Sequence, residues 1–201
     1  MMALDNHVLH DAEGSRGQNP QRRAFTIREA NGRDGPRYSH HMEQLVTETA
    51  FMLQGPDDVR PHPTEQRLIL GHIQQQSNCI CLIAFSSPNE RRQPILGNVT
   101  CLGGRTQCTQ HVAQLSMGVV KHAWRQGIGG ALLDAAMGWA RQQPSLMRIR
   151  LLVYEENAPA RRLYESRGFV SEGLLEGDAL HGDRYLNLVG MSVDVALGDA
   201  P

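Results

Sequence analysis

The sequence predicts an α/β domain. Several short runs alternate apolar with polar residues, which is the pattern of strands. Other stretches repeat apolar residues at helical spacing. A Gly-rich turn at 124–130 joins one of the strands to one of the helices. The order that results is strand, two helices, three strands, helix, strand, helix and two strands.

The composition is that of an ordinary globular protein. The length of 201 residues indicates one domain. We expect a disordered polar extension at 1–23, the domain at 24–196 and a tail at 197–201. A net charge of −1 gives no basic surface for nucleic acid. Without a membrane-length apolar run or a secretory pattern, we expect a cytoplasmic protein whose partners include neither nucleic acid nor membrane.

The four cysteines do not predict a disulfide framework or a metal site. Cys79 and Cys81 lie two apart in an expected strand, so they share a face and are poorly placed to bridge each other. Neither CxxC nor HxxxH spacing supports a zinc site, so no metal is expected. We interpret the cysteines as reduced residues of a cytoplasmic protein.

The first half of the chain predicts most of the strands. Met42, Leu45 and Val46 recur at helical spacing, and a Gly-Pro pair follows at 55–56. Two alternating runs separated by a polar turn at 87–92 predict an antiparallel hairpin. The expected elements are strand 25–30, helix 38–53, helix 64–76, and strands 78–85, 94–102 and 111–120.

The second half carries clear helix signals. Pro144 closes the helix that follows the Gly-rich turn. Asn157 is a good cap for the next helix, with Pro159 in its first turn and Gly168 at its end. The expected elements are helix 128–142, strand 147–153, helix 158–166, and strands 169–175 and 185–195 joined by a turn at 176–184.

The Gly-rich turn predicts an anion site. A turn of this kind aims free backbone N–H groups at one point, where the positive end of the helix dipole adds to them. The natural ligand is a phosphate or a pyrophosphate, which a Cβ would hold away from the backbone. Close packing of helix on strand is the alternative reason for such glycines.

Two segments together resemble the GNAT superfamily of N-acetyltransferases. The turn is similar to the family's (Q/R)xxGx(G/A) acetyl-CoA motif, with Trp124 in place of Gln or Arg, as in a subgroup of the family. Residues 153–169, VYEENAPARRLYESRGF, are similar to its pattern of strand, Asn and LYxxxGF. The resemblance implies a mixed, mostly antiparallel sheet of about seven strands. This sheet would be splayed between strands 4 and 5 and flanked by about four helices, with acetyl-CoA in the gap.

The resemblance also implies how acetyl-CoA is held. Main-chain groups on strand 111–120 would bind pantetheine, and a bulge there would polarise the thioester carbonyl. The Gly-rich turn would bind the pyrophosphate, and Asn157 would contact pantetheine. For Trp124, ligand contact and packing under the turn both stay open. The implied cofactor-binding residues are Met117, Val119, Trp124, Arg125, Gln126, Gly127, Gly129, Gly130 and Asn157.

The chemistry requires an acid for the leaving thiolate and a base for the amine. Tyr164 occupies the family's general-acid position, and a Tyr pKa of about 10 keeps it protonated at neutral pH. Packing against the core is its alternative role. His111 is the candidate base, because histidine is a common general base near neutral pH, while Glu155, Glu156 or a water-mediated base are the alternatives.

The resulting hypothesis is an acetyl-CoA-dependent N-acetyltransferase that transfers acetyl directly to a primary amine of a small molecule or of a protein or peptide. The alternative is a non-catalytic acyl-CoA-binding or regulatory module on the same fold. The acceptor groove is expected between helices 38–53 and 64–76 and the turn 176–184. Its acidic residues would be Glu43, Glu48, Asp178 and Asp183. The acceptor and a homodimer, which the family allows, stay open.

Overall fold

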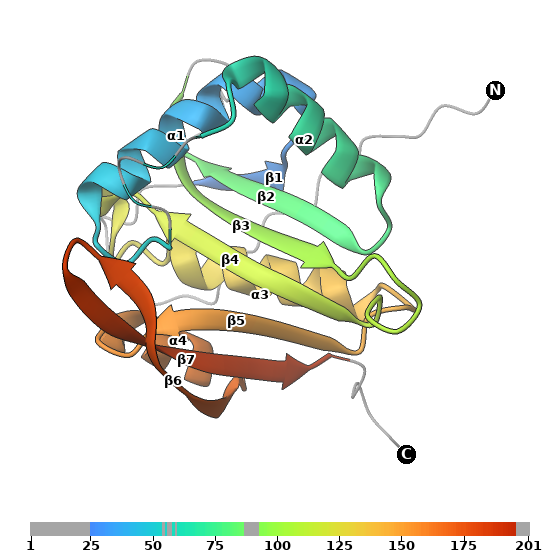
Figure 1. The fold of residues 1–201 in the computed structure, drawn as a ribbon. Coiled ribbons are helices and arrows are strands. Elements are labelled where there is room, and N and C mark those ends of the chain that lie inside the picture. The colour runs from blue at the N-terminus through green and yellow to red at the C-terminus, as the bar shows by residue number, and fades with distance from the viewer. Residues whose placement is uncertain (1–24, 54, 56–57, 59, 87–92, 196–201) are drawn as a thin grey trace, which may run out of the picture.

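The computed structural model describes residues 25–53, 55, 58, 60–86 and 93–195. The predicted extension at 1–23, the turn at 87–92 and the tail at 197–201 lie outside these residues. Figure 1 shows the described part as one sheet with helices on both faces.

The predicted order of elements is confirmed. The first half contains β1 (Thr26–Glu29), the short helix η1 (Gly32–Asp34), α1 (Gly35–Glu48), α2 (Pro63–Gln75), β2 (Cys79–Phe85), β3 (Ile95–Gly103) and β4 (Val112–Val119). The second half contains the short helix η2 (Lys121–Ala123), α3 (Ile128–Arg141), β5 (Arg148–Tyr154), α4 (Ala158–Glu165), β6 (Val170–His181) and β7 (Arg184–Asp194).

The sheet is mixed and opens in the middle, as predicted. Its seven strands have the order β1-β2-β3-β4-β5-β7-β6. Neighbours are antiparallel except β4 and β5, which are parallel. These two pair only from Val112 to Gln114 and from Arg148 to Arg150. Beyond these pairs the strands separate, which is the predicted splay between strands 4 and 5.

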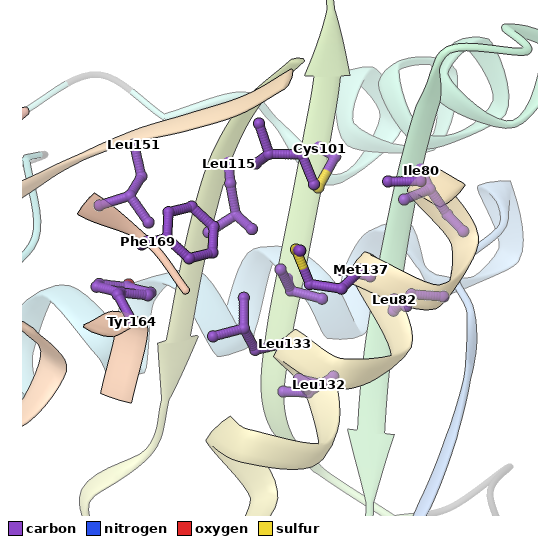
Figure 2. Close-up of a cluster of buried hydrophobic side chains, with 14 of the residues drawn as sticks. Ile80, Leu82, Cys101, Leu115, Leu132, Leu133, Met137, Leu151, Tyr164 and Phe169 are labelled. Carbon is purple, nitrogen blue, oxygen red and sulfur yellow. The ribbon is translucent and has the colours of Figure 1, made fainter. Parts of the chain in front are cut away.

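The two faces of the sheet carry different layers. In Figure 1, α1 and α2 lie on one side of β1–β4, and α3 lies on the other. The larger apolar cluster packs α3 and the region around α4 against the sheet, with residues such as Leu133, Met137 and Phe169 (Figure 2). A smaller cluster, which includes Leu70 and Phe85, lies under α1 and α2. The larger cluster extends to β5 and β7, whereas the smaller one lies over the β1–β3 part of the sheet.

A buried chain of polar side chains seats α1 on β3. His41 is 1% exposed, and its Nε2 lies 3.0 Å from Oδ1 of Asn98. The Asn98 amide donates to the Tyr38 hydroxyl at 3.0 Å, and that oxygen lies 3.4 Å from the Thr100 hydroxyl. Burial lowers the pKa of His41 to about 4. The neutral imidazole is thus part of the packing of α1.

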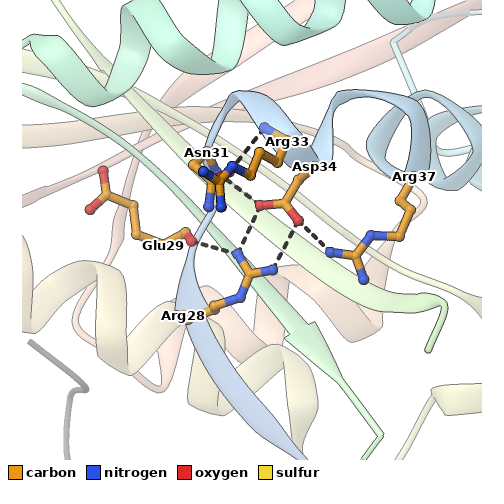
Figure 3. A network of polar contacts seen from close by, with 6 residues as sticks. All are labelled: Arg28, Glu29, Asn31, Arg33, Asp34 and Arg37. Carbon is orange, nitrogen blue, oxygen red and sulfur yellow. Dashed lines mark hydrogen bonds and ion pairs between the residues drawn. The ribbon is translucent and has the colours of Figure 1, made fainter. Parts of the chain in front are cut away.

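A carboxylate network fixes the start of α1 (Figure 3). Asp34 accepts two hydrogen bonds from Arg28, at 2.8 and 2.9 Å, and further ones from Arg37 and the Asn31 N–H. Burial alone would raise the pKa of Asp34, but these hydrogen bonds and the Arg28 charge hold it below its usual value. The network ties β1 to the beginning of α1.

Two predicted boundaries were wrong. The helix expected at 38–53 ends at Glu48, and the chain then continues without helical structure because tertiary contacts with β5 hold Phe51 and Met52. The turn expected at 176–184 is mostly strand, since β6 runs to His181 and β7 starts at Arg184. Gly177 adopts a φ of +63°, and its N–H bonds the Asn187 side chain, so the strand continues through an irregular register.

Two further features concern the cysteine thiols and the lengths of the helices. Cys79, Cys81, Cys101 and Cys108 are free thiols, and burial raises the pKa of Cys81 to about 11 and that of Cys101 to about 12. None of the helices in the described ranges is long and apolar enough to cross a membrane.

Candidate active site

The site is built around the gap between β4 and β5. Val119 lies opposite Gly97 of β3, and the next residue, Val120, donates its N–H to the Leu96 carbonyl at 3.0 Å. In an antiparallel pair this pattern turns the N–H and C=O of Val119 away from β3. Met117, two residues earlier, has the same orientation. The main-chain groups of both predicted pantetheine ligands therefore face the gap.

The bulge that the resemblance implies is not present in β4. The register with β3 runs without a shift from the Gly97–Val119 pair to the Gly103–Ala113 pair. The gap instead arises because β5 leaves β4 after Gln114, while the β3–β4 pairing continues. Gap-facing main-chain groups are thus provided by a regular strand that lacks a neighbour on one side.

The Gly-rich turn has the backbone of an anion site. Arg125 and Gly127 adopt left-handed φ values of 59° and 85°. Arg125 is the one non-glycine residue with positive φ in the described ranges, and such strain clusters at functional sites. Gly127 precedes α3 without a side-chain cap. The N–H groups of residues 128–130 are thus left for a ligand, because the first turn of a helix has no internal acceptors.

The glycines at the start of α3 serve different purposes. A Cβ on Gly129 would meet Leu163 at 3.4 Å and Met117 at 3.5 Å, which the neighbouring side chains can accommodate. A Cβ on Gly130 would lie only 2.7 Å from Nη2 of Arg167. A Cβ at position 130 would therefore displace the Arg167 guanidinium, while the left-handed backbone accounts for Gly127.

Trp124 lies directly against the gap. Its indole N–H donates to the Val119 carbonyl at 2.6 Å, and the residue is 45% exposed. Gln126 donates to the His122 carbonyl at 2.9 Å and so holds the turn together. The Trp124 indole thus bonds the Val119 carbonyl, one of the main-chain groups that the resemblance assigned to pantetheine.

Helix α4, which follows β5, carries Asn157 at its N-cap and Tyr164 in its last turn. The Asn157 side chain accepts the Ala160 N–H at 3.2 Å, which confirms the predicted cap. Tyr164 is 7% exposed, and its ring lies 5.7 Å from that of Phe169. Figure 2 shows the rings of Tyr164 and Phe169 on the same side of the cluster as Leu151 of β5. Burial raises the pKa of Tyr164 to about 12, so the hydroxyl keeps its proton at neutral pH.

The structure does not bring His111 to this site. Its carbonyl accepts the N–H groups of Met147 and Arg148, at the end where β4 and β5 are still paired. Eight residues of strand separate it from Val119, which corresponds to about 26 Å. The imidazole instead lines a small pocket with Cys108 and Arg150.

Residues 49–53 cross the open end of the gap, and we call them the crossing segment. At its start, Glu48 accepts the Lys121 N–H, just beyond β4, at 2.6 Å. At its end, the Tyr154 hydroxyl donates to the Met52 carbonyl at 3.2 Å, and the Tyr154 ring lies 6.0 Å from that of Phe51. The crossing segment therefore joins the walls on the face away from α3. The sequence did not predict the crossing segment, because residues 49–53 were assigned to the helix expected at 38–53.

The predicted acceptor groove needs one correction. Helix α2 packs against α1, η1 and β2, on the side of the sheet away from β5, so it does not border the gap. The tip of the β6–β7 hairpin does lie at the open end, beside the end of α1 (Figure 1). Near it, Asn187 donates to the Glu155 carboxylate at 2.8 Å, and Arg184 lies 3.5 Å from Glu156.

Comparison with known proteins identifies this arrangement. The sequence model of the Acetyltransferase (GNAT) family matches residues 42–169. A GNAT-family acetyltransferase from Streptococcus pneumoniae is 27% identical, with a TM-score of 0.79 over 85% of this chain and 99% of its own. A putative acetyltransferase from Salmonella typhimurium with its cofactor acetyl-CoA is 21% identical, with a TM-score of 0.72 over 89% and 98%. A ribosomal-protein-alanine N-acetyltransferase from Brucella melitensis is 22% identical, with a TM-score of 0.70 over 84% and 98%.

Proposed function

Because the chain belongs to the acetyltransferase (GNAT) family, whose acyl donor is acetyl-CoA, we propose that it transfers acetyl directly to a primary amine of a small molecule or a peptide. The gap carries this proposal. Main-chain groups of β4 face it without a neighbouring strand, a left-handed turn with free N–H groups lies beside it, and helix α4, which follows β5, carries a protonated tyrosine. The name of the Brucella neighbour, an N-acetyltransferase, is consistent with an amine acceptor.

The proposed cofactor-binding residues would contact the pyrophosphate and the pantetheine of acetyl-CoA. The N–H groups of residues 128–130, with Arg125 and Gln126, would bind the pyrophosphate. The gap-facing main chain of Met117 and Val119 would pair with the amides of pantetheine, as a neighbouring strand would. Asn157 would contact pantetheine from α4. Bound acetyl-CoA supplies the activated thioester.

Tyr164 would protonate the departing CoA thiolate. A general acid must hold its proton until the transition state, and burial keeps Tyr164 protonated far above neutral pH. No hydrogen bond to its hydroxyl is found within the described ranges, so the O–H is available to a ligand.

The proposal gives His111 no part in proton transfer, because it lies at the paired end of β4. Water would take the proton from the amine. Glu48 stays ionised, since hydrogen bonds from the Lys121 N–H and Gln44 outweigh burial and lower its pKa. Its charge would attract a cationic acceptor to the α1 end of the gap.

Acetyl transfer can be tested by released thiol. The purified protein with acetyl-CoA is screened against polyamines, amino acids, aminoglycosides and N-terminal peptides. With the best acceptor, Tyr164→Phe should lower kcat about a hundredfold. Its Kd for acetyl-CoA and its melting temperature should stay unchanged. An unchanged kcat would remove Tyr164 from the mechanism, and no thiol release with any amine would contradict the proposed acceptor class.

A further inference from the structure

We propose that Arg167 binds the phosphate groups of acetyl-CoA, and that Asp134 holds its guanidinium beside the first turn of α3 until the cofactor arrives. This inference rests on the proposed function in one respect, the presence of CoA phosphates at the Gly-rich turn. The resemblance assigns the site to residues of the turn and to Asn157, and it does not include Arg167.

The geometry brings Arg167 from α4 to α3. Arg167 follows α4, where its N–H bonds the Tyr164 carbonyl at 2.9 Å. Its Nε and Nη2 donate to the two carboxylate oxygens of Asp134 on α3, at 3.1 and 3.3 Å. Its Nη1 donates to the Ser166 hydroxyl at 2.8 Å. The guanidinium is thereby held in one orientation.

That orientation places the charge at the proposed phosphate site. A Cβ on Gly130 would lie 2.7 Å from Nη2, and Cβ atoms of a helix tilt toward its N-terminus. The guanidinium therefore lies beside the first turn of α3, close to the free N–H groups of residues 128–130. The glycine at 130 is what permits this approach, since a side chain there would displace Arg167.

The guanidinium also has donors left over. Of its five N–H groups, three are used by Asp134 and Ser166, so two remain for an anion. The Arg167 side chain is 31% exposed and that of Asp134 is 59% exposed, so a phosphate can reach them. Because Asp134 already orders the side chain, binding loses little conformational entropy.

A purely structural pair is the competing explanation. In that case the Arg167–Asp134 ion pair only joins α4 to α3, and removal of either partner should have the same effect. If Arg167 binds phosphate, the two removals should differ. Loss of Arg167 removes a ligand, while loss of Asp134 removes a negative charge that opposes the anion.

The test measures the Kd of CoA by calorimetry at fixed ionic strength. Arg167→Gln should weaken binding about tenfold, the loss of one charge-assisted hydrogen bond. Asp134→Asn keeps an amide oxygen that can accept a hydrogen bond from the guanidinium but removes the negative charge, so it should bind CoA at least as tightly as the wild type. Arg141→Gln, which removes an exposed charge at the far end of the same helix, should leave Kd unchanged. Acetyl-pantetheine, which has no phosphate, should bind wild type and Arg167→Gln equally.

The outcomes separate the two proposals. An unchanged Kd in Arg167→Gln, or equal weakening in Arg167→Gln and Asp134→Asn, would overturn the role of Arg167 alone. If Arg167→Gln weakened the binding of acetyl-pantetheine by the same factor, the role of Arg167 would also be overturned, because phosphate would not be the group recognised. A wild type that does not bind CoA would contradict the proposed function itself.

Discussion

The two faces of the gap are built from different parts of the chain. On the cofactor side, the proposed recognition would use main-chain groups of β4 and of the first turn of α3, which lie close together in sequence. On the acceptor side, the end of α1 and the crossing segment meet Lys121 and Tyr154, which lie far from them in sequence. Main-chain recognition leaves a short motif that can be found in a sequence, whereas a surface assembled from distant side chains does not.

The largest expected effect is a loss of stability at acidic pH on the acceptor side. That side depends on α1, which packs on β3 through the neutral side chain of His41. Its folded pKa of about 4 lies below its unfolded value of 6.5. The stability it contributes is therefore complete above pH 6.5 and is lost as the pH falls toward 4, by about 3 kcal/mol. Urea unfolding at several pH values should show this loss in the wild type.

Two neighbouring variants isolate that effect. His41→Gln should remove this part of the pH dependence, whereas His40→Gln, at an exposed site, should keep it. The same slope in wild type and His41→Gln would mean that His41 does not seat α1 as described.

The next effect belongs to the cofactor side. Gly127→Ala forces an L-residue into a left-handed conformation, which costs about 1–2 kcal/mol. Relief of this strain would turn the N–H groups away, so the Kd of acetyl-CoA should rise about tenfold. Gly138→Ala is the matched control, since it lies within α3 with open space around it and should stabilise the helix. Equal Kd values in both variants would contradict the role of the turn.

A smaller effect is expected from the crossing segment. Tyr154→Phe removes the hydrogen bond to the Met52 carbonyl but keeps the ring contact with Phe51. One hydrogen bond corresponds to about 1 kcal/mol. The KM for the amine should therefore rise about threefold to fivefold, with the Kd of acetyl-CoA unchanged. A change in Kd instead of KM would show that the crossing segment belongs to the cofactor side.

The smallest effect concerns Trp124. If pantetheine takes the Val119 carbonyl, the indole must release it, and tryptophan fluorescence should change on addition of acetyl-CoA. In Trp124→Phe the signal should disappear, because the remaining tryptophan, Trp139, lies within α3 and does not bond the Val119 carbonyl. Acetyl-CoA should still bind, with Kd within about threefold of the wild type, since the indole is not the main ligand. Persistence of the signal would place its source at Trp139.

Most of the fold could be predicted from the sequence because its signals are local. Alternation and helical spacing gave the order of elements, and Asn157 marked the start of α4. The splay between strands 4 and 5 came from the resemblance. The errors lie where long-range contacts override local pattern. Just beyond the end of α1, the Met52 carbonyl accepts a hydrogen bond from Tyr154, which is 102 residues away in sequence.

The candidate site divides in the same way. The turn and Tyr164 were predicted from their motifs. Arg167 lies in a variable position of LYxxxGF, and its proposed role follows only from its contact with α3. The position of His111 relative to the site could not be predicted from the type of its side chain. Histidine is a common general base, but the direction of β4 places His111 at the paired end of the gap.

Hydrogen exchange tests the central claim most directly, that acetyl-CoA binds in the gap through main-chain groups. On addition of acetyl-CoA, protection should rise at the amides of Met117 and Val119 and at residues 128–130, with little change in α2 or β1. Protection confined to other segments while acetyl-CoA is bound would contradict the account.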